Sequence, residues 1–301
     1  MMKNRMMTNR CLRGAVALLF ALGLSAQAAA GGTQKAFASP EIAVEALVDS
    51  VARNDDVEAR TILGINSERL LPLDQLSSED RLTFLAAWAK GHRILQDSDK
   101  AARLELSSGW TLPIPMVRTT NGWIFDTVAG KEEVRIRRIG RNELAAIETL
   151  RALVDAQQEY AEQDRNGDGV REFAQKILSS PGKQDGLYWP TAAGEPESPA
   201  GPLLDTRDLK DGYHGYRFRI LKAQGKAAPE GSKSYVKDGR LSEGFAAVAW
   251  PAHPGETGLM TFIVNHDGVV YQKYLGANTA AIAGAMTRFD PDASWTAVPA
   301  P

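Results

Sequence analysis

The chain is poor in the side chains that metal sites, disulfides and nucleophilic sites most often use. It has one cysteine, Cys11, and only four histidines. No two histidines have the spacing of a helical zinc site, and the chain has no G-x-S-x-G, Walker or G-x-G-x-x-G motif. The sequence therefore contains no recognised catalytic signature.

Long hydrophobic runs are also absent. The longest apolar stretch, Ala15–Leu24, is shorter than the ~20 residues that a membrane-spanning helix needs. Small residues follow it at Ala26–Ala30, and four basic residues precede it, Lys3, Arg5, Arg10 and Arg13. This pattern predicts a cleaved signal peptide over residues 1–30. We therefore expect a periplasmic or secreted protein that keeps no stable membrane anchor.

Neither sign of charge dominates the chain. The 35 basic and 37 acidic residues give a net charge of -2. Loss of the four basic residues of the signal peptide leaves 31 basic against 37 acidic residues, about -6 by the same count. This balance argues against general electrostatic binding of nucleic acid or anionic lipid. Because Cys11 leaves with the signal peptide, the mature core depends on packing without disulfides.

The N-terminal third of the mature chain has a helical pattern followed by a strand pattern. Ser39, the run Asn54–Asp56 and the capping-box-like Ser77–Asp80 predict the starts of three helices. The third helix is expected to bury one stripe, which contains Leu82, Leu85, Ala86 and Ala89.

Alternating apolar residues then predict an antiparallel meander from Ala101 onward, with a turn at Thr120–Gly122. Its expected inward positions are Leu104, Leu106, Trp110, Leu112, Ile114 and Met116. Pro113 and Pro115 would place one side of their strand at a sheet edge. Residues 31–138 thus resemble the cystatin-like and nuclear-transport-factor-like folds, in which helices pack on a curved antiparallel sheet.

The second half has the pattern of one long helix followed by strands. Asn142 is expected to cap a helix that runs to about Gln163, with Gln157–Glu162 in solvent. The apolar stripe of its first half is expected to be Leu144, Ile147, Leu150 or Arg151, and Val154. Asn265–Gly268 predicts a hairpin turn, and Gly276–Met286 a small closing helix. The expected strands are Tyr216–Leu221, Gly244–Trp250, Leu259–Val264 and Val269–Leu275. Residues 139–301 therefore resemble the soluble head of type IV pilins and pseudopilins, and the whole chain is predicted to be α+β.

One loop has the residues of a cation site. Asp164, Asn166 and Asp168 occupy positions 1, 3 and 5 of a D-x-N-x-D-G sequence. The Val170 carbonyl and Glu172 would supply further oxygens, which are the ligands that calcium prefers. Gln175 replaces the usual glutamate at position 12, so an EF-hand would be incomplete. The alternative is that these side chains cap the helix end and form turns with their own backbone.

Two other groups of residues could act on a ligand. Loop carboxylates at 185–211, namely Asp185, Asp205, Asp208 and Asp211, could form the carboxylate pair of a hydrolase. Trp189 lies beside Pro190 in a proline-rich connection, and such connections run over the surface. We therefore expect Trp189 to contact a partner.

Several runs of the mature chain resemble the exported bacterial proteins of domain-of-unknown-function family 2950. They are Arg138–Ile147, Asp155–Ala161, Asp164–Val170, Pro181–Pro190, Tyr213–Phe218, Met260–Asn265 and Asp267–Gln272. The resemblance spans essentially the whole mature chain, but it implies no activity.

Taken together, the sequence favours a non-catalytic binding or assembly module of the bacterial cell envelope. Its expected partner is an envelope protein or a glycan, and calcium is the one expected cofactor. The alternative is an envelope hydrolase that uses the carboxylates at 185–211.

Overall fold

The computed structural model describes residues 34–64, 67–68, 70, 76–192, 194–201 and 212–300. The expected signal peptide and the carboxylates Asp205, Asp208 and Asp211 lie outside these residues. Within the described ranges, no helix is both long enough and apolar enough to cross a membrane.

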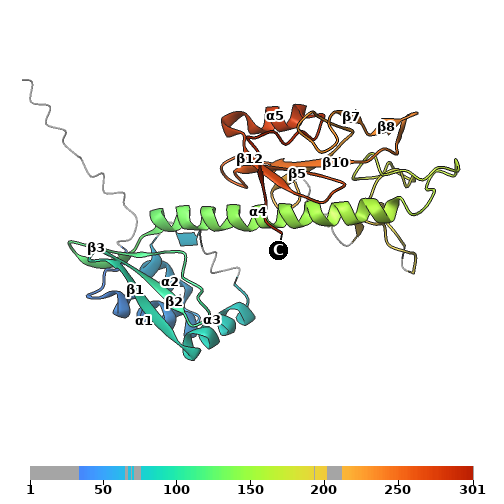
Figure 1. The fold of residues 1–301 in the computed structure, drawn as a ribbon. Helices are drawn as coiled ribbons and strands as arrows, with labels where there is room; N and C mark the ends of the chain where they lie inside the picture. Colours follow the sequence, from blue (N-terminus) through green and yellow to red (C-terminus); the bar gives the residue numbers. More distant parts are fainter. Residues whose placement is uncertain are drawn as a thin grey trace, which may run out of the picture.

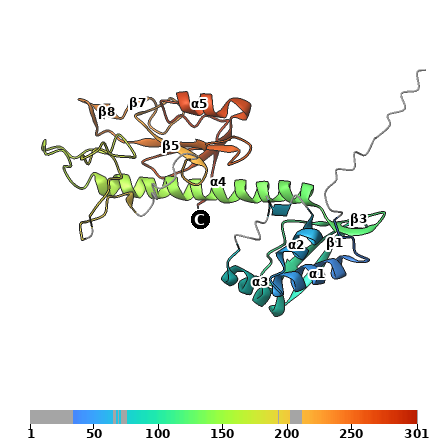
Figure 2. The same ribbon diagram turned by 180° about the vertical axis from the view of Figure 1, so that it is seen from behind.

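Two α+β units are joined by one long helix, α4 (Figures 1 and 2). The N-terminal unit has helices α1–α3 and an antiparallel sheet in the order β1-β2-β3-β4. The C-terminal unit has a second antiparallel sheet in the order β13-β12-β11-β10-β5. The predicted α+β fold class is therefore confirmed.

The N-terminal helices begin where their capping residues predict. They are α1 (Pro40–Ala52), α2 (Asp56–Leu63) and α3 (Ser78–Lys90). Ser39 accepts a hydrogen bond from the Ile42 amide, and Ser77 and Asp80 form a complete capping box. The expected burial of α3 is wrong: the structure buries none of its residues fully, and Leu82 is 66% exposed. Only one flank of α3, including Phe84 and Trp88, packs against the core.

The N-terminal sheet begins earlier than the sequence predicts. Its strands are β1 (His92–Ser98), β2 (Ala101–Leu106), β3 (Met116–Thr119) and β4 (Gly122–Phe125). Strand β1 was not expected, and the stretch from Trp110 to Pro115 is a loop, not part of a strand. The turn at Thr120–Gly122 is confirmed. Gly122 has a φ of 123°, and a Cβ there would lie 2.5 Å from the Phe37 carbonyl oxygen, so the position requires glycine.

Helix α4 covers Thr127–Tyr160, so the expected start at Asn142 is wrong. Asp126 caps it by accepting hydrogen bonds from the amides of Val128 and Ala129. Gly140 does not interrupt the helix, because a single glycine costs only ~1 kcal/mol in a helix interior. The expected division between residues 138 and 139 falls inside α4.

The predicted burial of α4 is confirmed in part, because Ile147, Leu150 and Val154 of the expected stripe are buried. Leu144 is instead 66% exposed, and Gln157 and Tyr160, which were expected in solvent, are 0% and 5% exposed. The C-terminal half packs on the C-terminal sheet, so its polar Gln157 and its Tyr160 lie inside the fold instead of in solvent.

The C-terminal sheet is covered on both faces. Its strands are β5 (Tyr216–Leu221), β10 (Ala246–Pro251), β11 (Met260–Asn265), β12 (Tyr271–Tyr274) and β13 (Thr296–Ala297). Helix α4 lies on one face and α5 (Thr279–Ala285) on the other, as Figure 1 shows. Strands β10 and β11 are therefore almost continuously buried and apolar. The hairpin at Asn265–Gly268 and the closing helix are confirmed, the latter preceded by the short η5 (Gly276–Asn278).

Two short ribbons extend the same unit toward the C-terminal end of α4. One pairs β6 (Ala223–Gln224) with β7 (Lys233–Ser234), and the other pairs β8 (Val236–Lys237) with β9 (Arg240–Leu241). The second ribbon places Arg240 against the loop that follows α4.

Candidate functional site

The chain folds back on itself where α4 ends. Gln157 fixes the returning segment: its amide donates to the Ala174 carbonyl at 2.9 Å and accepts from the Ala174 amide at 2.8 Å. Tyr160, the last residue of α4, donates its hydroxyl proton to the Gln184 carbonyl at 2.7 Å. Two side chains of one helix turn therefore hold the loops 161–173 and 179–190 at the same end of the molecule.

The oxygen-rich loop lies at this end and is largely closed by its own hydrogen bonds. The Asp164 carboxylate accepts from the amides of Gly169, Gly167 and Asp168 at 2.7, 2.8 and 3.3 Å. These donors, with the Gly169 amide first, lower the pKa of Asp164. Gly167 and Gly169 both have positive φ, which the tight loop needs.

Asp168 forms an ion pair with Arg240 of the second short ribbon. The Arg240 guanidinium donates to its carboxylate at 2.9 and 2.8 Å and is the main cause of its lowered pKa. The Asn166 amide nitrogen lies 3.2 Å from Asp168 and 2.9 Å from Glu172 Oε1. Glu172 Oε2 is buried and has no hydrogen-bond partner among the described residues.

The contacts of Asp164 match the alternative interpretation, in which the side chains of the loop bind the loop's own backbone amides. Among the described residues, no group of three or more His, Cys, Asp or Glu side chains has an arrangement that could hold a metal ion. The calcium site at Asp164, Asn166, Asp168, Val170 and Glu172 stays a prediction. An ion would have to compete with backbone amides at Asp164 and with Arg240 at Asp168.

Asp185 lies near this loop and is held by a cation and a turn. Lys176 Nζ lies 2.7 Å from its Oδ2, and the Ser180 amide donates to its Oδ1 at 2.7 Å. The Lys176 ammonium, followed by the Ser180 amide, lowers the pKa of Asp185 to about 2. At neutral pH this carboxyl is ionised and has no proton to give.

The Arg165 guanidinium lies among aromatic rings instead of beside a carboxylate. Its carbon is 5.4 Å from the Trp189 ring centre and 5.6 Å from the Tyr160 ring centre, within the range of cation–π attraction. Its Nε lies 3.5 Å from the Tyr160 carbonyl, and no ion pair joins Arg165 to any carboxylate among the described residues. Burial raises the pKa of the Tyr160 hydroxyl to about 12, so this ring stays neutral.

Two adjoining hollows open around Arg165. The first, here called the basic hollow, has a volume of about 700 Å³. Its charged lining residues are Arg165, Glu172, Lys176, Lys183, Asp185 and Lys222. The second, the aromatic hollow, has about 1040 Å³ and is lined by Tyr188, Trp189 and the prolines around them.

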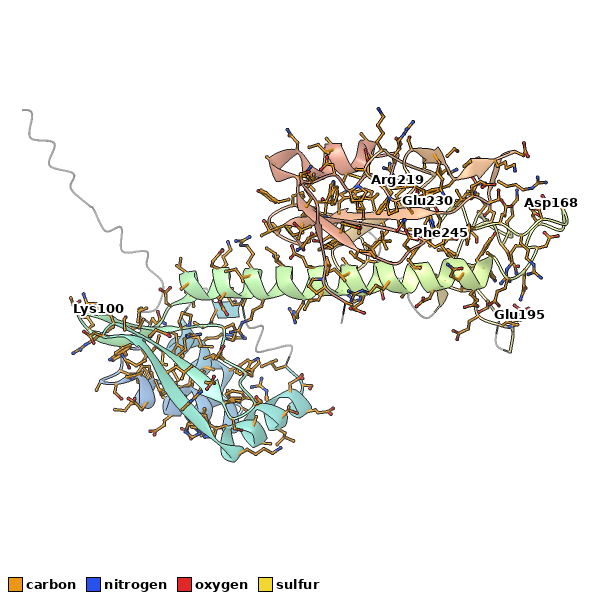
Figure 3. All side chains as sticks on the ribbon, viewed as in Figure 1. Lys100, Asp168, Glu195, Arg219, Glu230 and Phe245 are labelled. Atoms are coloured by element: carbon orange, nitrogen blue, oxygen red, sulfur yellow. The ribbon has the colours of Figure 1, made fainter. Side chains whose placement is uncertain are left out.

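The two hollows share Arg165, Gly182, Lys183 and Gln184, and together we call them the tip cleft. Figure 3 shows Asp168 and Glu195 at this end of the molecule, far from Lys100 at the opposite end.

The structure brings together residues that the sequence assigned to three separate candidate sites. Asn166 and Glu172 of the predicted calcium loop share the basic hollow with Asp185, and Trp189 forms a wall of the aromatic hollow. Trp189 is half-buried, with one part packed on the core. Arg165 and Lys183 were not predicted as site residues, because Arg165 stands at an unspecified position of the D-x-N-x-D-G loop and Lys183 belongs to no ligand-binding pattern.

Comparison with protein families gives one match. The family model described as "Protein of unknown function (DUF2950)" matches residues 34–298. The chain belongs to this family. Residues 34–298 include both units, α4 and the whole tip cleft, so the cleft is part of the DUF2950 region. No curated protein and no solved structure matches the chain, and the cystatin-like and pilin-like resemblances stay predictions.

Proposed function

We propose that this DUF2950 protein is a non-catalytic binding module of the bacterial cell envelope that holds its ligand in the tip cleft. The observation that carries the proposal is the half-buried Arg165, which lies within cation–π distance of two aromatic rings, is joined to no carboxylate of the described residues and opens to two hollows. A cation kept in this way is available to a ligand. The combined size of the hollows suits a small molecule or one segment of a polymer.

The sequence supports the cellular location in this proposal. The basic, apolar and small-residue regions at 1–30 form a signal peptide pattern, and the mature chain has no cysteine. We therefore propose a periplasmic or secreted protein whose partner is an envelope glycan or protein.

The chemistry of Asp185 does not suit the proton donor of the alternative hydrolase. A glycosidase of the common type needs one carboxylic acid that keeps its proton near neutral pH, which requires a raised pKa. The pKa of Asp185 is instead lowered to about 2 by Lys176 and Ser180. Asp185 is thus better suited to fixing the loop that carries Trp189 than to protonating a leaving group.

Capture by the immobilised mature protein tests the proposal. Envelope extracts would be passed over the wild type, Arg165→Gln and Trp189→Ala, with Arg141→Gln as the control because Arg141 is an exposed residue on α4, outside the cleft. We expect the two cleft variants to lose components that the wild type and the control retain. Circular dichroism would verify that all variants are folded.

One further variant, Asp185→Asn, separates binding from hydrolysis. A hydrolase that uses Asp185 would turn over extract polysaccharides as the wild type and lose this turnover in Asp185→Asn, whereas a binding module should show no turnover even as the wild type. If Arg165→Gln and Trp189→Ala capture the same components as the wild type, the tip cleft is not the binding site and the proposal is wrong.

A further inference from the structure

The basic hollow offers an excess of hydrogen-bond donors. Four of its charged lining residues are cations, Arg165, Lys176, Lys183 and Lys222, and two are acids. Both acids have partners: Asp185 binds Lys176, and Glu172 accepts from Asn166. In a mature chain with a charge of about -6, this hollow carries a local charge of about +2. A ligand group that fits here must accept hydrogen bonds and bear negative charge.

Arg165 is the cation best placed to bind that group. The rings of Tyr160 and Trp189 attract the guanidinium by cation–π contacts, and only its Nε makes a hydrogen bond to a described residue, the long one to the Tyr160 carbonyl. The two terminal nitrogens can therefore donate to a ligand. A planar guanidinium with two parallel donors matches a carboxylate in a bidentate arrangement. Lys183, on the shared wall of both hollows, adds a second positive charge.

The aromatic hollow has the opposite character. Three glutamates line it, Glu159, Glu195 and Glu197, together with the rings of Tyr188 and Trp189. An ionised carboxylate can accept hydrogen bonds but cannot donate them, so the ligand here must be rich in hydrogen-bond donors. A sugar ring combines hydroxyl donors at its rim with an apolar C–H face that can lie on an indole, whose large apolar surface binds such faces. The same glutamates repel the regularly spaced phosphates of a nucleic acid.

From these two halves we infer that the ligand of the tip cleft is a carboxylated glycan, whose sugar ring lies on Trp189 and whose carboxylate is bound by Arg165 and Lys183. This inference rests on the proposed function and names the ligand class for the same site. Two sources share this chemistry: glycans that contain muramic acid and polysaccharides of uronic acids.

Calorimetric titration of the mature protein tests the inference with matched probes. N-acetylmuramic acid linked to N-acetylglucosamine represents the first source, trigalacturonic acid represents the second, and the methyl ester of each masks the carboxylate while keeping the ring. We expect at least one acid to bind roughly tenfold or more tightly than its ester, because charge-assisted hydrogen bonds are lost in the ester. The acid that binds identifies the source.

Variants test the role of each hollow, carboxylate binding at Arg165 and ring binding at Trp189. Arg165→Gln should weaken binding of the acid roughly tenfold and leave the ester unchanged, since only the acid bears the charge that Arg165 binds. Trp189→Ala should weaken the acid and the ester by similar factors, because it removes the surface under the ring. Arg141→Gln is the control and should bind both probes as the wild type does.

Two results would overturn the inference without removing the proposed function. In the first, acid and ester bind equally and Trp189→Ala weakens both, so that the cleft binds a neutral glycan. In the second, neither acid binds, while Arg165→Gln still loses the components captured from envelope extracts, which would indicate a peptide or other ligand. If the cleft variants change neither the titrations nor the capture, both proposals fail.

Discussion

The two halves of α4 form one continuous helix in different surroundings. In the first half, Thr127–Ala145, only Gly130 and Ile139 are buried. The second half, Ala146–Tyr160, buries most of one face, from Ala146 and Leu150 to Tyr160, against the C-terminal sheet. The first half is instead rich in charge and carries the ion pairs of Arg135 with Glu132 and of Arg137 with Glu133.

This comparison distinguishes the local interactions that stabilise a helix from the burial that fixes the helix in the fold. The first half is stabilised by the Asp126 cap and by ion pairs three and four residues apart, which contribute a few tenths of a kcal/mol each. It also reaches the neighbouring units through polar contacts, such as Arg137 with the Thr111 carbonyl and Asn142 with the Thr257 carbonyl. The second half depends on burial, so it should be far more sensitive to truncation.

Two leucines of α4 give the largest expected contrast. Leu150 is 0% exposed and Leu144 is 66% exposed. Leu150→Ala should lower the free energy of unfolding by about 2 to 5 kcal/mol, because it leaves a cavity in the core. Leu144→Ala should change it by about 0.5 kcal/mol or less. Chemical denaturation measures both, and equal losses would show that α4 is covered along its whole length.

The buried amide of the second half should have the next largest effect. Gln157→Ala leaves the amide and the carbonyl of Ala174 without partners in a buried position, at about 1 to 3 kcal/mol for each group. The neighbouring Gln158 is exposed, so Gln158→Ala is the control. Limited proteolysis should also cut the loop 161–173 of Gln157→Ala sooner. Unchanged proteolysis would mean that Ala174 does not depend on this anchor.

Two glycines of the first half should respond with opposite signs. A methyl group at Gly140 meets no atom within 4 Å, so Gly140→Ala should stabilise the protein by up to about 1 kcal/mol through helix propensity. At Gly130 the methyl group would lie 3.0 Å from Ile114 Cγ1 and 3.3 Å from the Pro113 carbonyl oxygen. Gly130→Ala should therefore destabilise the protein by about 1 to 3 kcal/mol from overpacking, less the propensity gain. Thermal melts of both variants test the pair.

Low pH is expected to have a smaller effect, through Asp185 in the loop that Tyr160 holds at the end of α4. The pKa of Asp185 is lowered from 3.8 to about 2, so its ion pair contributes stability above pH 3.8 that is lost as the pH falls toward 2. The pair is solvent-exposed in part, which limits its contribution. In melts from neutral pH to pH 2, Asp185→Asn should lose less stability than the wild type. Asp155→Asn, at an exposed position on α4, should follow the wild-type curve.

Calcium is expected to have the smallest effect. The carboxylates of Asp164 and Asp168 already accept hydrogen bonds from backbone amides and from Arg240. The melting temperatures in millimolar calcium and in chelator should therefore agree. A clear rise in calcium would instead show an ion that binds the folded chain, as the sequence predicts. Asp168→Asn should then abolish the rise.

Much of the fold could be predicted because its signals are local. Ser39, Ser77 and the Asn265–Gly268 turn act on residues three or four positions away, and β5 covers the predicted Tyr216–Leu221. The start of α4 was missed because Asp126 directly follows a strand, while Gly140 and Asn142 look like a boundary. On α4 the stripe of Ile147, Leu150 and Val154 was predicted correctly, but the burial of Gln157 and Tyr160 was missed because residues much later in the chain cover them.

The tip cleft could be predicted only in pieces. The spacing of Asp164, Asn166 and Asp168 indicated an oxygen-rich loop, and the prolines near Trp189 indicated a surface connection. Nothing in the spacing indicated that Arg240 would pair with Asp168, or that Arg165 would lie within cation–π distance of Trp189. Each of these contacts joins separate loops, so it exists only after the sheet has placed them.

By itself, the sequence determined the α+β class, the capped helix starts, the hairpin and the membership of the DUF2950 family. Tertiary structure decided that Gln157 and Tyr160 of α4 are buried, that Asp185 is an ion-pair partner of Lys176, and that Arg165 opens to a cleft. The physical reason is the range of the interactions. Caps, turns and helix ion pairs act within one turn of the chain, whereas burial and the charge balance of a cleft depend on residues that only the folded sheet brings together.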